Sequence, residues 1–401
     1  MDCLAFAIEP WEKLFGCRQA IMSRLAKSHK LLLAGPPNYF GGLIHASQRK
    51  ALPKSGITWR ADQFYTLAPS KFFFATDKLQ LWDQFSRELR VQQIRHTLAS
   101  LRFGPLALFL WHPMFANMLG TFDELVSCYY VYDHFAGFLQ SDPEKRSIEE
   151  NEEKILRSAD IVFTAGLGLF KEKNKYGNAI NVPNGVDYDL FSRALSQDPI
   201  PEELVAIPEP RLGYLGNINE KVDIEILQYL AVERPAWSIV FVGADRLGTA
   251  ESRKSFDTLR QLRNVHFLGP KLQQAIPGYL RGMNVCLIPY CMSGWSYFGC
   301  PLKLHEYLAG GKPVVASALP SVCDFHRVVY VANSLPEWVA SVERALAENS
   351  PDLVNRRLEV ARANGWDERI AVIEKAIASK AEEKQHKFSA ATKPYSHNMF
   401  L

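Results

Sequence analysis

The residues best suited to chemistry lie in one short stretch, Ser296–Ala316, with the sequence SYFGCPLKLHEYLAGGKPVVA. Lys303 and Glu306 are three residues apart, so on a helix their side chains project near each other. The backbone N–H groups of Leu302 and Lys303 would be unpaired donors at the helix start, which is where anions bind. Glu306 would lie roughly 7 Å further along the axis, at 1.5 Å per residue. A diphosphate at the helix start would therefore place a ribose near the Glu306 carboxylate.

The same spacing is equally compatible with an ordinary Lys–Glu pair on the surface of a helix, and the local sequence leaves both interpretations open. The helix itself is well defined. Pro301 suits its first position, where no backbone donor is needed. Leu304, Tyr307 and Leu308 are at helical spacing and should face a core. Gly310 and Gly311 should end the helix, and a strand should follow over Pro313–Ala316.

Polar residues also follow two apolar, strand-like runs in the first half. His112 ends the run 106–111, and Asp133-His134 follows the run 127–132. Ligands of open α/β sheets lie just past the carboxyl ends of parallel strands, so these three residues are candidates for a site. A structural role remains the alternative for each of them.

The second half offers glycines and a lysine at a comparable place. The strand predicted over 211–216 contains Gly213 and ends at Gly216, and Lys221 lies in the loop that follows. Glycine allows a backbone to approach a phosphate or a sugar closely. Asp187-Tyr188-Asp189 has the DxD pattern that holds a metal on some nucleotide sugars. It follows an Asn-Gly turn, so we expect a turn cap and no metal site.

Composition restricts the class of protein. The 401 residues, 47% hydrophobic, suffice for two domains. A net charge of +3 is too small to indicate nucleic acid binding, but it permits a local basic face near anionic lipid. The cysteines are scattered without CxxC spacing, which favours reduced thiols in the cytosol over a disulfide framework or zinc site. We expect neither a signal peptide nor a membrane span, because the most apolar stretch, 106–119, is short and interrupted.

Strand and helix patterns alternate in both halves of the chain, which predicts an α/β protein with two doubly wound parallel sheets facing a cleft. The turn at 181–187 is the predicted boundary between the domains. A long amphipathic helix is expected over 80–101, with five core contacts: Leu81, Phe85, Leu89, Ile94 and Leu98. A last helix over 366–383 should bury Ile370, Ile373 and Ile377, and a polar tail follows it.

Three segments resemble the GT-B glycosyltransferases of the family 4 type. Val182–Asp187 with Phe191 looks like their VPNGVD…F junction, Leu302–Val315 like their nucleotide-binding helix, and Asn364–Arg369 like their closing segment. Trp111-His112-Pro113 with Tyr132-Asp133 resembles the branch that acts in bacterial cell-surface polysaccharide synthesis, of the teichuronic-acid and rhamnan type.

The resemblance implies the GT-B fold with two Rossmann-like domains. Residues 1–185 would bind the acceptor, 186–368 the nucleotide sugar, and 369–401 would return to the first domain as a crossover helix with a mobile tail. By position, Glu306 matches the glutamate that holds the ribose hydroxyls. The remaining donor-site residues would be Leu302 and Lys303 at the distal phosphate, Gly213 and Gly216 in the first loop of the second domain, and Gly269 near the base.

Two departures from the family bear on the donor site. Phe298 stands where the family often has a second glutamate that touches the donor sugar, and Asn217 stands where it usually has an arginine. Lys221 remains as a partner for the pyrophosphate, and Lys303 is our hypothesis for the charge that the missing arginine would have supplied.

The implied activity is glycosyl transfer from a nucleotide sugar to a saccharide or lipid-linked acceptor, without a metal or cofactor. Stabilising the diphosphate leaving group is then the main catalytic task. Retention of configuration is expected by analogy, whereas an inverting enzyme would use His112 or Asp133 as base. A nucleotide-sugar epimerase and a catalytically silent assembly partner are the alternatives.

We expect a cytoplasmic protein, with the inner-membrane surface as a further partner. Aromatic and basic residues within 60–78 and 87–102 could form a docking face in the first domain. Core aromatics beneath a solvated helix surface are the alternative.

Overall fold

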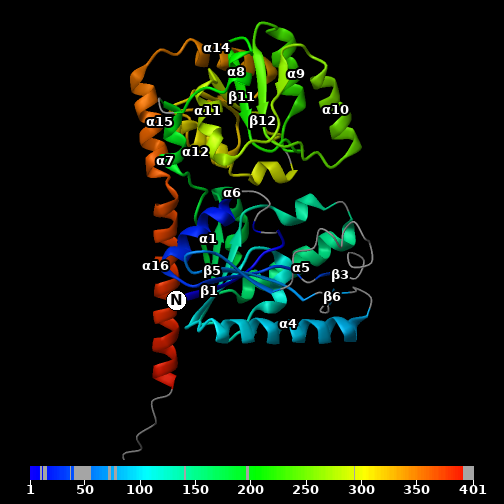
Figure 1. Ribbon diagram of the computed structural model, residues 1–401, viewed down its shortest axis with the longest axis vertical. Coiled ribbons are helices and arrows are strands. Elements are labelled where there is room, and N and C mark those ends of the chain that lie inside the picture. The colour runs from blue at the N-terminus through cyan, green and yellow to red at the C-terminus, as the bar shows by residue number, and fades with distance from the viewer. Residues whose placement is uncertain are drawn as a thin grey trace, which may run out of the picture.

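The computed structural model describes residues 1–9, 11, 16–36, 38–39, 56–70, 74–75, 79–139, 141–195, 198–292 and 294–391. It has two α/β domains stacked on each other, each built on its own sheet, and a long final helix that runs beside the N-terminal domain (Figure 1). The predicted fold class, two doubly wound domains of the GT-B type, is confirmed.

The sheet of the N-terminal domain has the order β10-β9-β8-β7-β1-β2-β5-β4. Its pairings are parallel except that of β4 with β5. Leu4 in the central strand β1 faces Leu32 and Leu108 in its two neighbours, and all three are fully buried. The strands are β1 (Asp2–Phe6), β2 (Leu31–Ala34), β4 (Gly56–Ala61), β5 (Phe64–Ala68), β7 (Leu106–Leu110), β8 (Val126–Val131), β9 (Ile161–Thr164) and β10 (Ala179–Asn181), with a separate pair β3 (Asn38–Tyr39) and β6 (Phe74–Ala75).

The sheet of the C-terminal domain is wholly parallel, in the order β13-β12-β11-β14-β15-β16. Its strands are β11 (Arg211–Leu215), β12 (Ser238–Val242), β13 (Val265–Phe267), β14 (Val285–Ile288), β15 (Val314–Ser317) and β16 (Tyr330–Ala332). The strand order reverses direction between β11 and β14. In open parallel sheets such a switch point opens a crevice at the carboxyl ends of the strands, and that is where ligands bind.

Helices cover both sheets. In the N-terminal domain they are α1 (Cys17–Ser28), α4 (Gln80–Ser100), α5 (Asp142–Ser158) and α6 (Leu167–Lys173). In the C-terminal domain they are α7 (Tyr188–Ser192), α8 (Glu202–Val205), α9 (Ile224–Glu233), α10 (Ala250–Arg260), α11 (Ile276–Arg281), α12 (Leu302–Ala309), α13 (Pro320–Cys323), α14 (Leu335–Leu346) and α15 (Pro351–Ala363). α10 was not foreseen from the sequence.

The last helix, α16 (Trp366–Ala391), ties the end of the chain to the N-terminal domain, and it is longer than predicted. Ile370, Ile373 and Ile377 are buried against that domain, as predicted. Arg24 Nε on α1 donates to Asp367 Oδ1 at 2.9 Å. The start of α16 lies beside the segment that joins the two domains: a Cβ on Gly185 would approach the Trp366 side chain to 3.0 Å, so a side chain there would crowd the tryptophan.

Two local predictions were wrong. Leu81 and Phe85 of α4 are 83% and 54% exposed, whereas Ile94 and Leu98 are buried as expected. The helix contributes Val91, Ile94 and Leu98 to the core beneath the sheet, while its first half lies by the short strand β6. Pro301 is the residue before α12 rather than its first helical residue. Of the strand predicted at 71–74, residues 71–73 lie outside the described part of the chain.

Candidate active site

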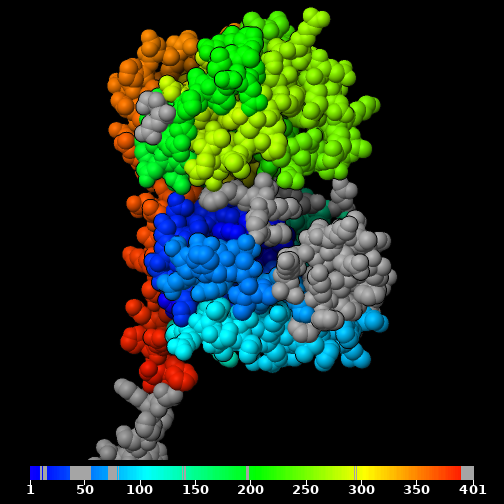
Figure 2. Space-filling model, viewed as in Figure 1, coloured from blue at the N-terminus to red at the C-terminus, as the bar shows by residue number. Residues whose placement is uncertain are grey.

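A cavity of about 380 Å³ lies between the two domains at the switch point of the C-terminal sheet, and Figure 2 shows the seam between them from one side. The wall from the N-terminal domain comes from the start of α1 and the residues after β8: Glu9, Gly16, Cys17, Arg18, Gln19, Tyr132 and Asp133. The opposite wall comes from the ends of β11 and β14 and the start of α12: Leu215, Gly216, Asn217, Asn219, Lys221, Tyr290, Gly299, Cys300, Pro301, Leu302, Lys303 and Glu306. Asn184 of the connecting segment completes the lining.

The start of α12 forms part of this wall. Leu304, Tyr307 and Leu308 are almost fully buried, as their spacing predicted, and they anchor the helix on the sheet. Pro301 precedes the helix and makes no side-chain hydrogen bond to it. Leu302 and Lys303, the first two helical residues, line the cavity. The positive end of the helix therefore meets the cavity, where it favours an anion.

Lys303 is 7% exposed although it carries an ammonium group. Its Nζ atom lies 3.5 Å from the centroid of the Tyr214 ring and 5.2 Å from that of Tyr290. Burial lowers the pKa of Lys303 well below its usual value, and the nearby Glu306 carboxylate opposes this shift. A buried ammonium favours the binding of a counter-charge, since an uncompensated charge is costly away from water.

Glu306 lies one helical turn further along the same wall. Burial raises the pKa of its carboxyl group to about 7, although Lys303 acts in the opposite direction. Glu306 also lines a small adjoining hollow that lies against Val186, Phe191 and Trp366. A carboxylate in this position can accept hydrogen bonds from vicinal hydroxyl groups of a ligand that lies along α12.

An ion pair joins the two walls. Lys221 Nζ donates to Asp133 Oδ2 at 3.0 Å, and both side chains are largely buried, at 17% and 13% exposure. The neighbouring His134 stacks its ring on Phe298 of the C-terminal domain, with centroids 5.0 Å apart. Glu172, 3.5 Å from His134 Nε2, raises the pKa of this histidine. Asp133 and His134 therefore both reach the opposite domain from the end of β8.

The three predicted glycines occupy different environments. Gly216 ends β11 with φ +134°, lines the cavity, and would bring a Cβ to 3.1 Å from Lys303 Nζ. Gly213 lies inside β11 rather than in a loop, where a Cβ would clash with Met283 at 2.6 Å, so its absent side chain serves packing. Gly269 has φ +70° in the loop after β13 and is not among the cavity residues.

His112 is set back from the cavity walls. Its Nδ1 atom accepts a hydrogen bond from Met114 N at 3.2 Å and so caps the 3-10 helix Pro113–Met118. Its ring packs edge-on against Phe135, with centroids 4.8 Å apart. Burial lowers its pKa to about 4, so the imidazole is neutral at pH 7.

Asp187 acts as the turn cap that was expected from the sequence. Its carboxylate accepts from Leu190 N at 3.2 Å at the start of α7, and the other aspartate of the DxD pattern, Asp189, is exposed. This arrangement uses the first aspartate for local structure.

Several residues of the site were missed by the sequence reasoning. Tyr290 and Asn184 line the cavity, and Tyr214 is buried behind it, against Lys303. Tyr214 lies one residue before the end of β11, and Tyr290 follows β14, the neighbouring strand. The rule that sites lie at strand ends could have found both tyrosines, had the order of the strands been known. Asn184 Nδ2 donates to the Cys300 carbonyl at 2.6 Å and thereby ties the connecting segment to the loop before α12.

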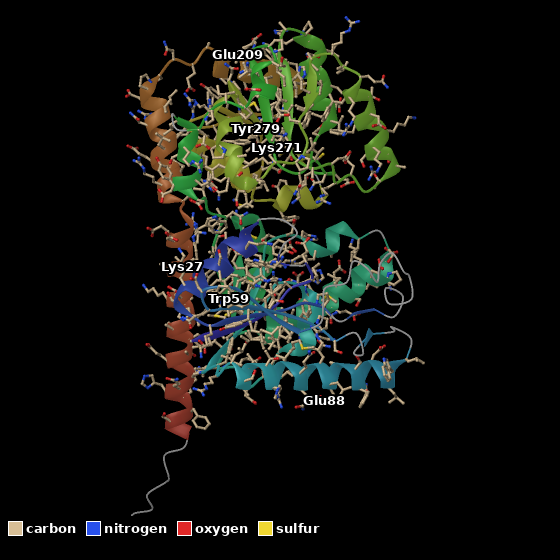
Figure 3. The ribbon with its side chains drawn as sticks, viewed as in Figure 1. Lys27, Trp59, Glu88, Glu209, Lys271 and Tyr279 are labelled. Carbon is tan, nitrogen blue, oxygen red and sulfur yellow. The ribbon has the colours of Figure 1, made fainter. Side chains whose placement is uncertain are left out.

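The outer face of α4 carries apolar and charged groups together. Leu79, Leu81 and Phe85 are exposed at its N-terminal end. Arg87 is exposed on the next turn, and Glu88 points away from the domain in Figure 3. None of the helices in the described part of the chain has the length and apolar character needed to cross a bilayer.

Comparison with known proteins finds a family model that matches part of the C-terminal domain. Residues 209–348 match the model of the group 1 glycosyl transferases. A protein of Bacillus subtilis (strain 168), TuaH, whose name assigns it to teichuronic acid biosynthesis as a glycosyltransferase, is 32% identical over 234 residues. That alignment covers 56% of this chain and 58% of the relative, so the chain spans about three-fifths of the relative's length.

Solved structures share the fold over almost the whole chain. Sucrose-phosphate synthase from Thermosynechococcus elongatus has a TM-score of 0.67 at 16% identity, covering 97% of this chain and 100% of its own. Anabaena HepE, solved in complex with UDP and glucose, has a TM-score of 0.63 at 13% identity, covering 94% and 100%. At these identities the likeness concerns the fold.

Proposed function

We propose that this chain, whose residues 209–348 match the model of the group 1 glycosyl transferases and which has a GT-B fold, transfers a sugar from a nucleotide sugar to a saccharide acceptor. The observation that carries the proposal is the set of Lys303, Glu306 and Gly216 on one wall of the cavity between the domains. The wall lies at the switch point of a parallel sheet, which is the usual place for a nucleotide.

The donor is proposed to lie along the start of α12. Its diphosphate meets the amides of Leu302 and Lys303 and the Lys303 ammonium, and its ribose hydroxyls donate to the Glu306 carboxylate. Negative charge grows on the diphosphate as the glycosidic bond breaks, so these donors stabilise the transition state more than the ground state. Lys221 is a second cation on the same wall. It also stabilises the negative charge of the diphosphate once the donor is bound.

The acceptor is proposed to enter from the wall of the N-terminal domain. A saccharide or a lipid-linked saccharide of cell-surface polysaccharide or glycoconjugate synthesis fits the similarity to a protein named for teichuronic acid biosynthesis. The protein would act in the cytoplasm, at the inner surface of the membrane. The exposed Leu81 and Phe85 of α4, beside the exposed Arg87, support a membrane-facing role for that helix.

Flotation with anionic liposomes tests the membrane contact. We expect part of the protein to float with the liposomes, and Leu81→Gln with Phe85→Gln to reduce this fraction. A wild-type protein that stays entirely in the soluble fraction would refute the contact.

The transfer is proposed to retain the anomeric configuration and to need no metal, since cationic groups of the chain itself lie where the leaving group would be. Addition of EDTA should leave turnover unchanged, and a loss that Mg²⁺ or Mn²⁺ restores would contradict this. An inverting transfer needs a general base. Asp133 lies on the cavity wall and is the favoured candidate for that role, ahead of His112.

Two other functions use the same site. A nucleotide-sugar epimerase would release an altered nucleotide sugar without an acceptor, so product analysis in the absence of acceptor identifies it. A silent assembly partner would bind a nucleotide without turning it over on any acceptor of a broad panel. The stack of Phe298 on His134 supports the silent partner, because an aromatic pair occupies a place where the family often has a glutamate that contacts the donor sugar.

Thermal shift with UDP, GDP, dTDP and ADP tests the proposal. A ligand at one hundred times its Kd stabilises the protein by about 2.7 kcal/mol. We expect one of the four to stabilise the wild type, and Glu306→Ala to lose that stabilisation. Glu225→Ala, an exposed glutamate on α9, is the matched control and should keep it. If none of the four nucleotides raises the melting temperature of the wild type, the proposed donor site is refuted and the silent partner is favoured.

A further inference from the structure

Two tyrosines at the switch point surround the ammonium group of Lys303. Tyr214 comes from β11 and Tyr290 follows β14, so the order of the strands brings them side by side. Lys303 Nζ lies 3.5 Å from the Tyr214 ring centroid and 5.2 Å from that of Tyr290. Both distances are within the range of a cation–π interaction, which extends to about 6 Å.

The lysine has little freedom to leave this position. It is 7% exposed, and Tyr214 is completely buried beneath it. On another side lies the backbone of Gly216, where even a Cβ would approach Lys303 Nζ to 3.1 Å. The Tyr214 hydroxyl donates to the Asn217 carbonyl at 2.8 Å, so the ring that carries the ammonium also holds the loop after β11.

The two aromatic rings attract the positive charge of Lys303, but they do not act as ordinary hydrogen-bond acceptors for its N–H groups. Of the charged groups that the structure describes, Glu306 and Lys221 are those that act on the charge of Lys303, and neither is within ion-pair distance of it. Lys303 lines the cavity together with Tyr290 and Gly216, so a ligand bound there can reach its N–H donors. An oxyanion with several oxygens, such as a diphosphate, is the ligand that such a fixed ammonium matches.

We propose that Tyr214 and Tyr290 are positioning residues that hold the Lys303 ammonium at the place where the diphosphate of the donor binds. This inference rests on the proposed function and adds to it two residues outside the motif of α12. Preorganisation is the physical gain: a flexible lysine loses side-chain entropy when it orders on a ligand, whereas one held between two rings has already lost it. The plain alternative is that both tyrosines only fill the core of the C-terminal domain, to which both belong.

A double-mutant cycle separates these explanations. The probe is whichever of UDP, GDP, dTDP and ADP binds the wild type, and its affinity is measured for wild type, Tyr214→Leu, Lys303→Met and the double variant. With Lys303 present, Tyr214→Leu removes the aromatic ring and should weaken binding of the nucleoside diphosphate roughly three- to thirtyfold. In the Lys303→Met background the same substitution should change the affinity less than about twofold, because the partner of the ring is gone.

Tyr214→Phe and a parallel cycle on Tyr290 complete the design. Phenylalanine keeps the aromatic ring but loses the hydrogen bond to the Asn217 carbonyl, so Tyr214→Phe should bind more tightly than Tyr214→Leu and somewhat less tightly than the wild type. Tyr290 is at the cavity wall and further from the ammonium, so Tyr290→Leu should have the smaller effect and remain testable even if Tyr214→Leu does not fold. The matching nucleoside monophosphate serves as the control ligand, and its affinity should depend less on either ring.

The outcomes distinguish the two proposals. Equal losses in the wild-type and Lys303→Met backgrounds would overturn the positioning role while leaving the donor site intact. A Tyr214→Phe variant that binds as poorly as Tyr214→Leu would overturn it as well. If none of the four nucleoside diphosphates binds the wild type, the proposed function itself fails, and the positioning role fails with it.

Discussion

The carboxylate of Asp133 lies 3.0 Å from the ammonium of Lys221, so a salt bridge joins the two domains across the cavity between them. Asp133 follows β8 of the N-terminal domain, and Lys221 lies in the loop after β11 of the C-terminal domain. Lys221 is also the cation expected to meet the donor diphosphate. A carboxylate and a phosphate therefore compete for the same lysine.

This competition predicts that Asp133→Asn binds a nucleoside diphosphate more tightly than the wild type. Although both side chains are largely buried, the pair borders the open cavity, and we take its contribution as about 1 kcal/mol, which corresponds to about fivefold in affinity. Turnover should fall in the same variant if Asp133 also serves the acceptor. Isothermal titration measures the affinity, and Asp189→Asn, an exposed aspartate outside the cavity, is the control. Weaker binding in Asp133→Asn would contradict the competition.

Lys303 and Lys221 should differ in their contribution to nucleotide affinity. Lys303 lines the cavity at the start of α12. A hydrogen bond to a charged group contributes about 1.5–3 kcal/mol. Lys303→Ala should therefore lose roughly ten- to a hundredfold in affinity, well beyond Lys221→Ala, which also releases Asp133. Lys254→Ala on the exposed side of α10 provides the baseline. Equal, small losses in both cavity variants would refute the assigned role of Lys303.

Nucleotide binding should depend on pH through Glu306. Burial raises the pKa of its carboxyl group to about 7. The ionised form accepts stronger hydrogen bonds from the ribose hydroxyls than the protonated form does. Affinity should thus fall as the pH drops below 7, by up to about tenfold per unit. Lys303, whose pKa is lowered by burial, should weaken binding at high pH as it loses its proton.

Glu306→Gln provides the control for this profile, because the ligand's own phosphate titrates with a pKa of about 6. The fall in affinity at low pH that remains in Glu306→Gln comes from protonation of the ligand. The additional fall seen in the wild type comes from protonation of Glu306. Parallel acidic limbs in the two proteins would show that Glu306 does not control the binding.

His112→Ala should affect stability more than catalysis. The imidazole caps a 3-10 helix by accepting from Met114 N, and loss of a helix cap typically costs about 1 kcal/mol. A retaining transfer without a histidine base predicts turnover within a few-fold of wild type. His112→Asn, which keeps an acceptor, should recover part of the stability. Near-total loss of turnover with unchanged nucleotide affinity would instead favour His112 as the base of an inverting transfer.

The local sequence was sufficient to predict most of the helices and strands, including the helix that carries Lys303 and Glu306. The spacing of Leu304, Tyr307 and Leu308 decides which face of α12 is buried, and periodicity is a property of neighbouring residues. The same logic identified the buried face of α16. It was wrong for Leu81 and Phe85, because whether an apolar stripe is covered depends on how far the sheet extends beneath the helix.

Only the tertiary structure decided which groups meet in the cavity. Asp133 and Lys221 are 88 residues apart, and Tyr214 reaches Lys303 only because β11 and β14 are neighbours in the sheet. Strand order and the approach of two domains depend on contacts between segments distant in the chain, and no local pattern encodes them. The sequence alone determined the two α/β halves and the positions of the charged residues, whereas long-range packing determined the partners of those charges.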